Sequence, residues 1–376
     1  MKILIVVPAY NEEASIADVV TEINSLKKNY DIVVIDDGSS DRTYETVRAA
    51  FRKEIDSGRV LLLAKENGGK ASAANYGLNH VTEPIFVAID ADTVIHPEAI
   101  VRMVQHFSDP KVGAVAGNAK VGNRVNLWAR WQALEYITSQ NFERRALNTV
   151  GAVSVVPGAV GAWRTTAVRE VGCYHQDTVA EDADLTMSLL QAGYRINYED
   201  RALAYTEAPV NASGLMRQRF RWSFGILQAV VKHRSALRRG RALGWIALPN
   251  IVIFQILLPL VSPFIDVMYI VGAISYGLDR YFHPDSANPA DFERLTLFFL
   301  VFLVMDFVAA LIAFSLERKE ARMREDKWLL AQVWLQRFAY RQIFSVVLFK
   351  TLKRAVDGRS FDWDKLERTA RLTHAS

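Results

Sequence analysis

The chain has 376 residues, of which 51% are hydrophobic, 23% charged and 11% aromatic. This composition allows one large domain or two of ordinary size, and it excludes disordered and collagen-like proteins. The net charge of +4 is too small to indicate a nucleic-acid partner, and the single cysteine, Cys173, excludes an internal disulfide and a cysteine-rich metal site. The mean hydropathy of +0.06 is high for a chain with 45 basic and 41 acidic residues, which indicates an uneven distribution of apolar residues.

Short apolar runs alternate with amphipathic segments at the start of the chain. The first run, Ile3 to Val7, is too short for the core of a secretory signal, and it predicts a buried strand. The alternation predicts a mostly parallel α/β sheet. The predicted strands cover residues 3–7, 32–35, 60–63 and 85–89, and the predicted helices cover residues 15–28, 42–51 and 71–79.

Polar residues follow each of these four runs, at the edge where ligands bind in such sheets. A turn or a helix cap would explain any one segment alone. Four such segments, one after each predicted strand, instead predict a single crevice lined by carboxylates and a lysine. The segments are Pro8-Ala9-Tyr10-Asn11-Glu12, Asp36-Asp37-Gly38-Ser39, Glu66-Asn67-Gly68-Gly69-Lys70 and Asp90-Ala91-Asp92.

The residue types in this crevice indicate its ligand. Asp90 and Asp92 offer the oxygen ligands that a hard divalent cation prefers and often shares with phosphates. Lys70 follows two glycines and is placed to meet a phosphate or a nucleobase edge. We therefore predict a nucleotide diphosphate with Mg²⁺ or Mn²⁺. Neither a Walker P-loop nor a dinucleotide-binding glycine motif is present in the sequence.

The sequence resembles the family 2 glycosyltransferases over roughly residues 1–360. The resemblance implies a GT-A fold, a Rossmann-like nucleotide-diphospho-sugar transferase domain, over residues 1–230. Its Q-x-x-R-W signature is associated with processive members such as cellulose, chitin, hyaluronan and poly-N-acetylglucosamine synthases. The motifs are P-A-Y-N-E-E, V-I-D-D-G-S-S-D, G-G-K-A-S-A-A-N, D-A-D, Gly158 to Arg164, Ala180-Glu181-Asp182 and Gln218-Arg219-Phe220-Arg221-Trp222.

The resemblance also implies roles for single residues. Asp182 would be the general base, because an acceptor hydroxyl is a weak nucleophile until its proton is accepted. Asp90 and Asp92 would hold the metal that bridges the two phosphates, Asp92 most directly. In-line attack would invert the anomeric carbon. The implied substrate-binding residues, contacts to uracil and ribose among them, are Pro8, Tyr10, Glu12, Asp36, Asp37, Lys70, Asp90, Glu181, Gln218, Arg221 and Trp222.

The segment 214–229 has helical spacing and many basic residues. That pattern alone is typical of an amphipathic helix on an anionic membrane surface, with Trp222 as an interfacial anchor. The resemblance implies in addition that Arg221 reaches the diphosphate and that Trp222 stacks on the terminal sugar of the acceptor. The two interpretations are compatible.

Two features depart from the family pattern. Ala180 stands where threonine is usual, although the acidic pair after it is retained. Close relatives usually carry one or two membrane spans before the transferase domain, whereas here the domain begins at residue 1. Whether this chain alone forms a complete translocation path therefore stays open.

Two long apolar stretches, Leu243 to Leu278 and Leu295 to Leu316, follow the transferase motifs. About twenty apolar residues cross a bilayer core, so each stretch predicts a span, the first re-entrant or kinked before Pro259. A third stretch is interrupted by glutamines and arginines. The predicted membrane-embedded region is 231–376, with spans at about 248–277 and 295–316 and interfacial or hairpin helices at about 328–350.

Each apolar stretch contains one acid, Asp266 in the first and Asp306 in the second. Acids at membrane depth are candidates for function in sugar passage, or they hydrogen-bond between helices. The histidines, His175 and His233 among them, show no ligand spacing, and we interpret them as structural or surface residues.

Basic residues predict the orientation of the chain. Segments 232–241 and 317–327 each carry five Lys or Arg, whereas 279–294 carries two. Because basic loops stay in the cytoplasm, we expect a multi-pass protein of the inner (cytoplasmic) membrane with its catalytic domain in the cytoplasm, where UDP-sugars occur.

The sequence thus predicts a membrane-bound inverting glycosyltransferase that uses a UDP-sugar, with UDP-N-acetylglucosamine favoured, to extend a β-linked polysaccharide. The alternative is transfer of a single sugar to polyprenyl phosphate or another lipid. A non-catalytic subunit is disfavoured because Asp92 and Asp182 are both present. Expected partners are the sugar donor, a growing glycan or lipid acceptor, membrane lipids, and a partner membrane subunit or deacetylase, with no nucleic acid.

Overall fold

The computed structural model describes residues 2–26, 30–284, 289–319 and 326–357. Its N-terminal part is built on an eight-stranded sheet in the order β3-β2-β1-β4-β7-β6-β8-β5. The strands are β1 (Ile3–Ala9), β2 (Asp31–Asp36), β3 (Val60–Ala64), β4 (Ile85–Ala88), β5 (Thr93–Ile95), β6 (Val112–Val121), β7 (Gly161–Arg164) and β8 (Arg195–Thr206).

The first four strands pair in parallel, as the sequence predicts. Successive side chains of a strand point to opposite faces, and both faces of β1 are covered. Ile5 and Val7 belong to one apolar cluster, which includes the buried side of α1 (Ile16–Ser25), whereas Leu4 belongs to a second cluster together with α4 (Lys70–Leu78). Burial on both faces explains why these strands are continuous apolar runs.

The predicted helix 42–51 is confirmed as α2 (Thr43–Ala50), and a second short helix, α3 (Arg52–Asp56), follows it. Phe51 lies between the two helices with φ −118° and ψ 30°, and its ring is buried in the same apolar cluster as Ile5 and Val7. The end of the predicted first helix, at residues 27–28, lies outside the described residues.

The second half of the sheet is mixed. β7 runs antiparallel to both β4 and β6, β6 and β8 are parallel, and β5 is antiparallel to β8. The helical elements of this half are α5 (Ala99–Val104), η1 (Gln105–Ser108), α6 (Leu127–Glu135), η2 (Tyr136–Asn141), α7 (Phe142–Thr149), α8 (Thr165–Glu170) and α9 (Glu181–Ala192).

A long helix, α10 (Ala212–Lys232), follows the last strand. It begins where the Asn211 side chain accepts a hydrogen bond from the backbone N–H of Gly214 at 2.7 Å, which satisfies an otherwise unpaired N–H of the first turn. The remaining elements are α11 (Ala236–Arg239), η3 (Leu243–Ala247), α12 (Leu248–Asn250), η4 (Ile251–Leu257), α13 (Leu258–Phe282), α14 (Pro289–Leu316), α15 (Asp326–Ala331) and α16 (Val333–Val356).

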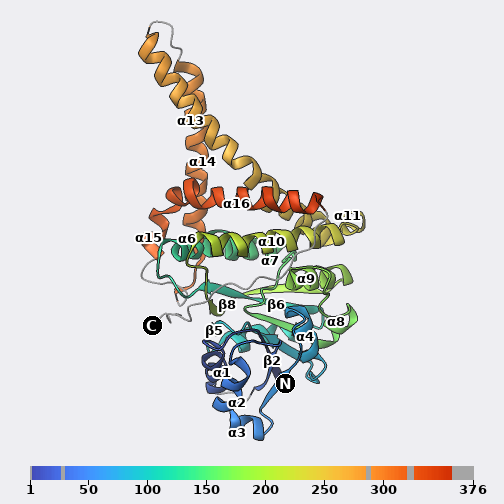
Figure 1. Ribbon diagram of the computed structural model, residues 1–376. Coiled ribbons are helices and arrows are strands. Elements are labelled where there is room, and N and C mark those ends of the chain that lie inside the picture. The colour runs from blue at the N-terminus through green and yellow to red at the C-terminus, as the bar shows by residue number, and fades with distance from the viewer. Residues whose placement is uncertain (1, 27–29, 285–288, 320–325, 358–376) are drawn as a thin grey trace.

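Two of these helical stretches are long and apolar enough to cross a membrane. Leu243–Phe282 runs for 40 residues and Pro289–Leu316 for 28, with mean hydropathies of 2.1 and 2.8 in their most apolar windows. Most of each window is exposed in the chain, which distinguishes them from core helices. Figure 1 shows α13 and α14 projecting away from the sheet, with α16 lying across them next to α10.

The first apolar stretch is helical throughout, from Leu243 to Phe282. Its predicted irregularity before Pro259 corresponds to π-helical turns over Ile251–Leu257. The third stretch, predicted as interfacial or hairpin helices, forms α15 and α16. The membrane topology stays a prediction. Residues 285–288 and 320–325, in the loops used to predict orientation, and residues 358–376 of the predicted membrane-embedded region lie outside the described residues.

Asp266 and Asp306 bind an arginine of α16. The Arg337 guanidinium donates to Asp266 Oδ1 at 2.8 Å and to Asp306 Oδ2 at 2.8 Å, and Arg341 also reaches Asp306 at 2.7 Å. Of the two interpretations of these acids, the structure therefore supports bonding between helices. These ion pairs join α13 and α14 to α16.

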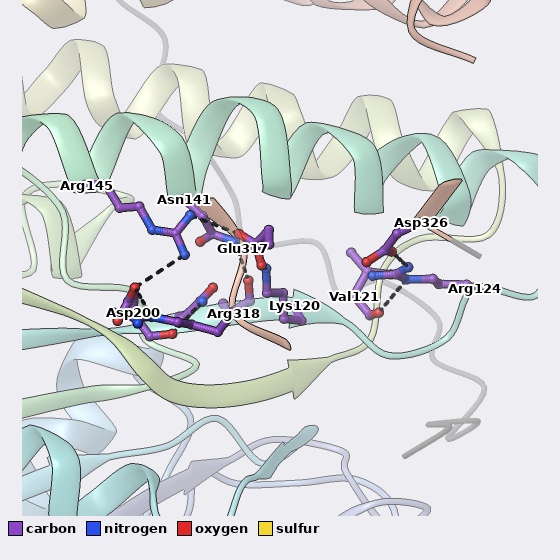
Figure 2. A network of polar contacts seen from close by, with 11 residues as sticks. Lys120, Val121, Arg124, Asn141, Arg145, Asp200, Glu317, Arg318 and Asp326 are labelled. Atoms are coloured by element: carbon purple, nitrogen blue, oxygen red, sulfur yellow. Dashed lines mark hydrogen bonds and ion pairs between the residues drawn. The ribbon is translucent and has the colours of Figure 1, made fainter. Parts of the chain in front are cut away.

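A second polar network joins the end of α14 to the catalytic part (Figure 2). Glu317 is buried, and its carboxylate binds Lys120 of β6 and accepts from Arg145 of α7 at 3.1 Å. At the start of α15, Asp326 pairs with Arg124 at 2.7 Å. Burial lowers the pKa of Lys120, and Glu317 opposes this shift. The chain after α14 is therefore fastened to the edge of the sheet.

Candidate active site

A cavity of about 410 Å³ lies between the carboxyl end of the sheet, α10 and the C-terminal helices. The structure brings eight of the predicted site residues into its wall. They come from the start of α4, the loop after β4, the start of α9 and the middle of α10, and they are Lys70, Asp90, Asp92, Glu181, Asp182, Gln218, Arg221 and Trp222.

Lys70 and Asp90 form the charged floor of the cavity. Lys70 Nζ lies 2.5 Å from Asp90 Oδ1 and 3.5 Å from Glu181 Oε1. Burial would lower the pKa of Lys70, but Asp90, Glu181 and Asp182 outweigh it, so the pKa is raised and the lysine stays charged. Burial also raises the pKa of Glu181, which Lys70 opposes. Lys70, predicted as a donor near the nucleotide, here also neutralises the carboxylates.

Gly158 brings the backbone close to this pair. A Cβ at position 158 would collide with Lys70 Nζ and would lie 3.3 Å from Asp90 Oδ1. The backbone N–H of Gly158 donates to Asp182 Oδ2 at 3.2 Å, and Asp182 Oδ1 accepts from the N–H of Ala183 at 2.8 Å. Asp182 is thus oriented at the first turn of α9, where it lines the cavity.

The carboxylates of Asp90 and Asp92 suit a hard divalent cation, because they supply only oxygen ligands. Both line the cavity. Asp90 also binds Lys70 Nζ at 2.5 Å, and Asp92 accepts from Thr93 Oγ1 at 3.2 Å.

A second group with metal-ligand geometry lies beside α9. His175, Asp177 and Asp184 have ligand atoms within 4.8 Å of one another. Lys232 Nζ, however, donates to Asp177 at 2.7 Å and to Asp184 at 2.9 Å, and His233 also bonds Asp184. Burial would raise the pKa of Asp184, but its bonds to His233, Lys232 and His175 lower it to about 2. These bonds tie α9 to α10, which agrees with a structural interpretation of both histidines.

The other predicted donor-side residues lie outside the main cavity. Pro8 lines a smaller pocket that shares Lys70 and Asp90 with it. The Asp37 carboxylate accepts from Lys65 Nζ at 2.6 Å and from the N–H of Gly69 at 2.8 Å, so it holds the 65–69 loop in place. Tyr10, Glu12 and Asp36 lie at the ends of β1 and β2. Their nucleoside-binding roles stay predictions.

Several cavity residues escaped the sequence analysis. Glu135 and Glu143 come from helices without a family motif, and Phe254, Gln255 and Phe344 come from the C-terminal region. Gln255 Nε2 donates to Glu143 Oε1 at 3.1 Å, which closes one side of the cavity. Of these residues, only Gln255 gives a signal in the sequence, because it is a polar residue inside an apolar stretch.

The helix α10 approaches α9 very closely at Gly225. A Cβ on Gly225 would lie 2.5 Å from both the Cβ and the backbone N of Ala180. Gly225→Ala must therefore push α10 away from α9 and carry Trp222 with it. We expect a loss of about 1 to 3 kcal/mol in the free energy of unfolding, typical of overpacking, together with reduced transferase activity. Thermal unfolding and sugar transfer measure the two effects.

Gly277→Ala is the matched control, because nothing lies within 4 Å of a Cβ at this helical position. It should leave both quantities unchanged. Wild-type stability and activity in Gly225→Ala would show that the α9–α10 contact does not fix the site.

The sheet, with acidic residues after its central strand β4, is that of a GT-A glycosyltransferase. The family model described as "Glycosyltransferase like family 2" matches residues 2–225, and the chain belongs to this family. Its fold is the predicted GT-A α/β fold.

Curated relatives include the poly-beta-1,6-N-acetyl-D-glucosamine synthases of Staphylococcus aureus (strain COL) and Staphylococcus epidermidis. They are 33% and 34% identical to this chain over 218 residues, which is 57% of this chain and 52% of each relative. The chain spans about half the length of the curated relatives it matches.

Among solved structures, the fold is similar to that of a mannosyltransferase from Pyrobaculum calidifontis in complex with GDP-Man and Mn²⁺. The TM-score is 0.60 at 19% identity, covering 96% of this chain and 88% of that one.

Proposed function

We propose that the protein is a membrane-bound inverting glycosyltransferase that uses a UDP-sugar, UDP-N-acetylglucosamine, to extend a β-linked polysaccharide. The observation that carries the proposal is the shared cavity. Asp182, Arg221 and Trp222 line it together with Phe254 and Pro259 of the long apolar helix. The residues proposed for sugar transfer and a path for the glycan toward the lipid would therefore share one cavity. The names of the staphylococcal relatives support the choice of sugar.

The charges of the cavity fit a nucleotide diphosphate. Asp92, with Asp90, would hold Mg²⁺ or Mn²⁺, which neutralises charge on the leaving diphosphate when bound. Arg221 and the half-buried ammonium of Lys70, which line the same cavity, would add hydrogen-bond donors for the diphosphate. Asp182 accepts the proton of the acceptor hydroxyl as that oxygen attacks the anomeric carbon and the bond to the departing UDP breaks. Attack opposite the leaving group converts an α-linked donor into a β-linked product.

The exposed apolar helices support a membrane location. The exposed rings of Phe264, Phe298 and Trp334 lie on α13, α14 and α16, a distribution that suits lipid better than water. The basic cluster of 232–241 lies directly before the first apolar helix, which supports the proposal of a cytoplasmic catalytic domain. A cytoplasmic domain has access to UDP-sugars.

A pair of substitutions on α10 tests extension of the glycan. If Trp222 stacks on the acceptor end, Trp222→Ala should weaken acceptor engagement by about 1 to 3 kcal/mol, the magnitude known for bases on aromatic side chains. The variant should still hydrolyse UDP-sugar or make short products while long polymer is lost. Arg221→Ala should impair hydrolysis and transfer alike, because the lost charge serves the leaving diphosphate. Product length on gels and UDP release provide the readouts.

Trp222→Phe, which keeps a ring, should recover much of the polymer length. Trp328→Ala is the matched control, because Trp328 is an exposed tryptophan of α15 outside the cavity. Polymer of unchanged length and rate from correctly inserted Trp222→Ala protein would refute the stacking role. It would favour transfer of one sugar to a lipid such as polyprenyl phosphate.

A further inference from the structure

Arg219 is a buried charge beside the active site for which the proposed reaction has no use. Its side chain is 2% exposed although it lies on α10 between Gln218 and Arg221. Guanidinium Nη1 donates to the side-chain carbonyl of Gln218 at 2.9 Å. Nη2 donates to Glu135 Oε2 at 2.6 Å. The arginine therefore fixes the direction of the Gln218 amide, which lines the cavity.

The same guanidinium lies over the ring of Trp222, with its central carbon 4.1 Å from the ring centroid. A cation at this distance is attracted to the face of the ring. The ring of Phe344 lies on another side of the guanidinium, 5.5 Å away. One face of Trp222 is thus occupied by Arg219, while the tryptophan also lines the cavity.

Two other helices hold Arg219 in place. Glu135 ends α6, and Tyr340 belongs to α16. The Tyr340 hydroxyl donates to the same oxygen of Glu135 that Arg219 binds, at 2.5 Å. Burial and the Glu135 charge raise the pKa of Tyr340 well above its ordinary value, so the hydroxyl keeps its proton and acts as the donor. The arrangement joins α6, α10 and α16 at one carboxylate.

A contribution to folding stability alone is a poor explanation for the buried pair of Arg219 and Glu135. Removing an arginine and a carboxylate from water costs several kcal/mol per ion, and apolar side chains of similar volume often serve stability as well. A fixed fork of donors, by contrast, holds neighbouring groups in one geometry. The two neighbours that Arg219 holds on α10 are the cavity residues Gln218 and Trp222.

We propose that Arg219 is a positioning residue for the carbohydrate acceptor, held by Glu135 and Tyr340, and that it acts through Gln218 and Trp222. The proposal rests on the proposed function, which assigns Trp222 to the acceptor. It makes α16 part of the acceptor site, although Tyr340 lies 118 residues beyond Trp222 in the sequence.

Arg219→Lys and Tyr340→Phe test the proposal in the full-length protein. Lysine at position 219 keeps the charge but cannot donate as a planar fork. Phenylalanine at position 340 removes the hydroxyl that donates to Glu135. We expect the KM for acceptor to rise about 10- to 100-fold in Arg219→Lys, the size of a lost hydrogen bond to a charged group, and by less in Tyr340→Phe. UDP-N-acetylglucosamine hydrolysis without acceptor should stay at the wild-type rate in both.

Tyr198→Phe is the matched control. Tyr198 is buried, and its hydroxyl has no hydrogen-bond partner among the described residues, so its loss should leave the acceptor KM unchanged. The acceptor probe is a short β-1,6-linked N-acetylglucosamine oligosaccharide. If the wild type extends only lipid, the probe is polyprenyl phosphate.

A double-mutant cycle with Trp222→Ala separates positioning from general damage. If Arg219 acts through Trp222, Arg219→Lys should change the acceptor KM much less in the Trp222→Ala background than in the wild type. Equal effects in both backgrounds would overturn the proposal, as would a parallel loss of acceptor-free hydrolysis and thermal stability. If Arg219→Lys fails to fold, the same double-mutant cycle is measured with Tyr340→Phe in place of Arg219→Lys, and the same comparison of acceptor KM values tests the proposal.

The cycle is independent of the product that the wild type makes. A wild type that adds one sugar would refute glycan extension and leave the cycle measurable. Long polymer combined with an unchanged acceptor KM in both variants would overturn only the role of Arg219.

Discussion

Asp182→Asn should lower sugar transfer by about two to four orders of magnitude, the range usual for loss of a general base. The substitution keeps the size of the side chain, and the amide oxygen can still accept from the N–H of Gly158 or Ala183. The change removes a proton acceptor from the cavity with little loss of shape. UDP binding should therefore remain near the wild-type value in a titration that accompanies the rate measurement.

Asp18→Asn provides the control for Asp182→Asn. Asp18 is an exposed carboxylate in the first turn of α1, as Asp182 is in the first turn of α9. Its substitution tests the effect of removing a negative charge from a helix N-terminus, about 0.3 to 1 kcal/mol. Loss of UDP binding in Asp182→Asn as large as the loss of transfer would assign this carboxylate to the donor instead.

Removal of divalent metal should abolish turnover, and Mg²⁺ or Mn²⁺ should restore it. A cation at the developing charge of the leaving group contributes several kcal/mol, and each 1.36 kcal/mol corresponds to a tenfold change in rate. Asp92→Asn should resemble the chelated wild type and should need much higher metal concentrations. UDP release in buffers of fixed free metal measures both.

Full activity in excess chelator would contradict the metal assignment. In that case Lys70, which lies 2.5 Å from Asp90, and Arg221 would supply the positive charge for the leaving diphosphate. Glu143→Gln is a useful comparison. It removes a carboxylate that lines the same cavity and accepts from Gln255, and it should leave the metal requirement unchanged.

The parallel half of the sheet was predictable because its strands are buried on both faces and are therefore continuous apolar runs. The ends of these strands carry polar residues, so Lys70, Asp90 and Asp92 were predicted to converge, and all three line the cavity. The short helix α3 after Phe51 was not predicted, because its five residues, 52–56, include none that is buried and so give no apolar pattern.

The polar contacts beside the cavity escaped prediction for a different reason. Glu135, Tyr340 and Arg219 lie far apart in the sequence and meet only when α6, α16 and α10 pack together. Likewise, Arg337 appeared only as an interruption of an apolar stretch until α16 brought it to Asp266 and Asp306. Helical spacing reveals the face of one helix, whereas tertiary packing decides which faces meet.

The central claim is that this chain extends a β-linked polymer from a UDP-sugar in the membrane. The most direct test incubates membranes containing the purified full-length protein with a panel of UDP-sugars. UDP release is measured first, and the product is then sized and digested with linkage-specific hydrolases. We predict release with UDP-N-acetylglucosamine above all others, and a long product that a β-N-acetylglucosaminidase degrades. A product of one sugar on a lipid, or turnover with a different donor only, would contradict the claim.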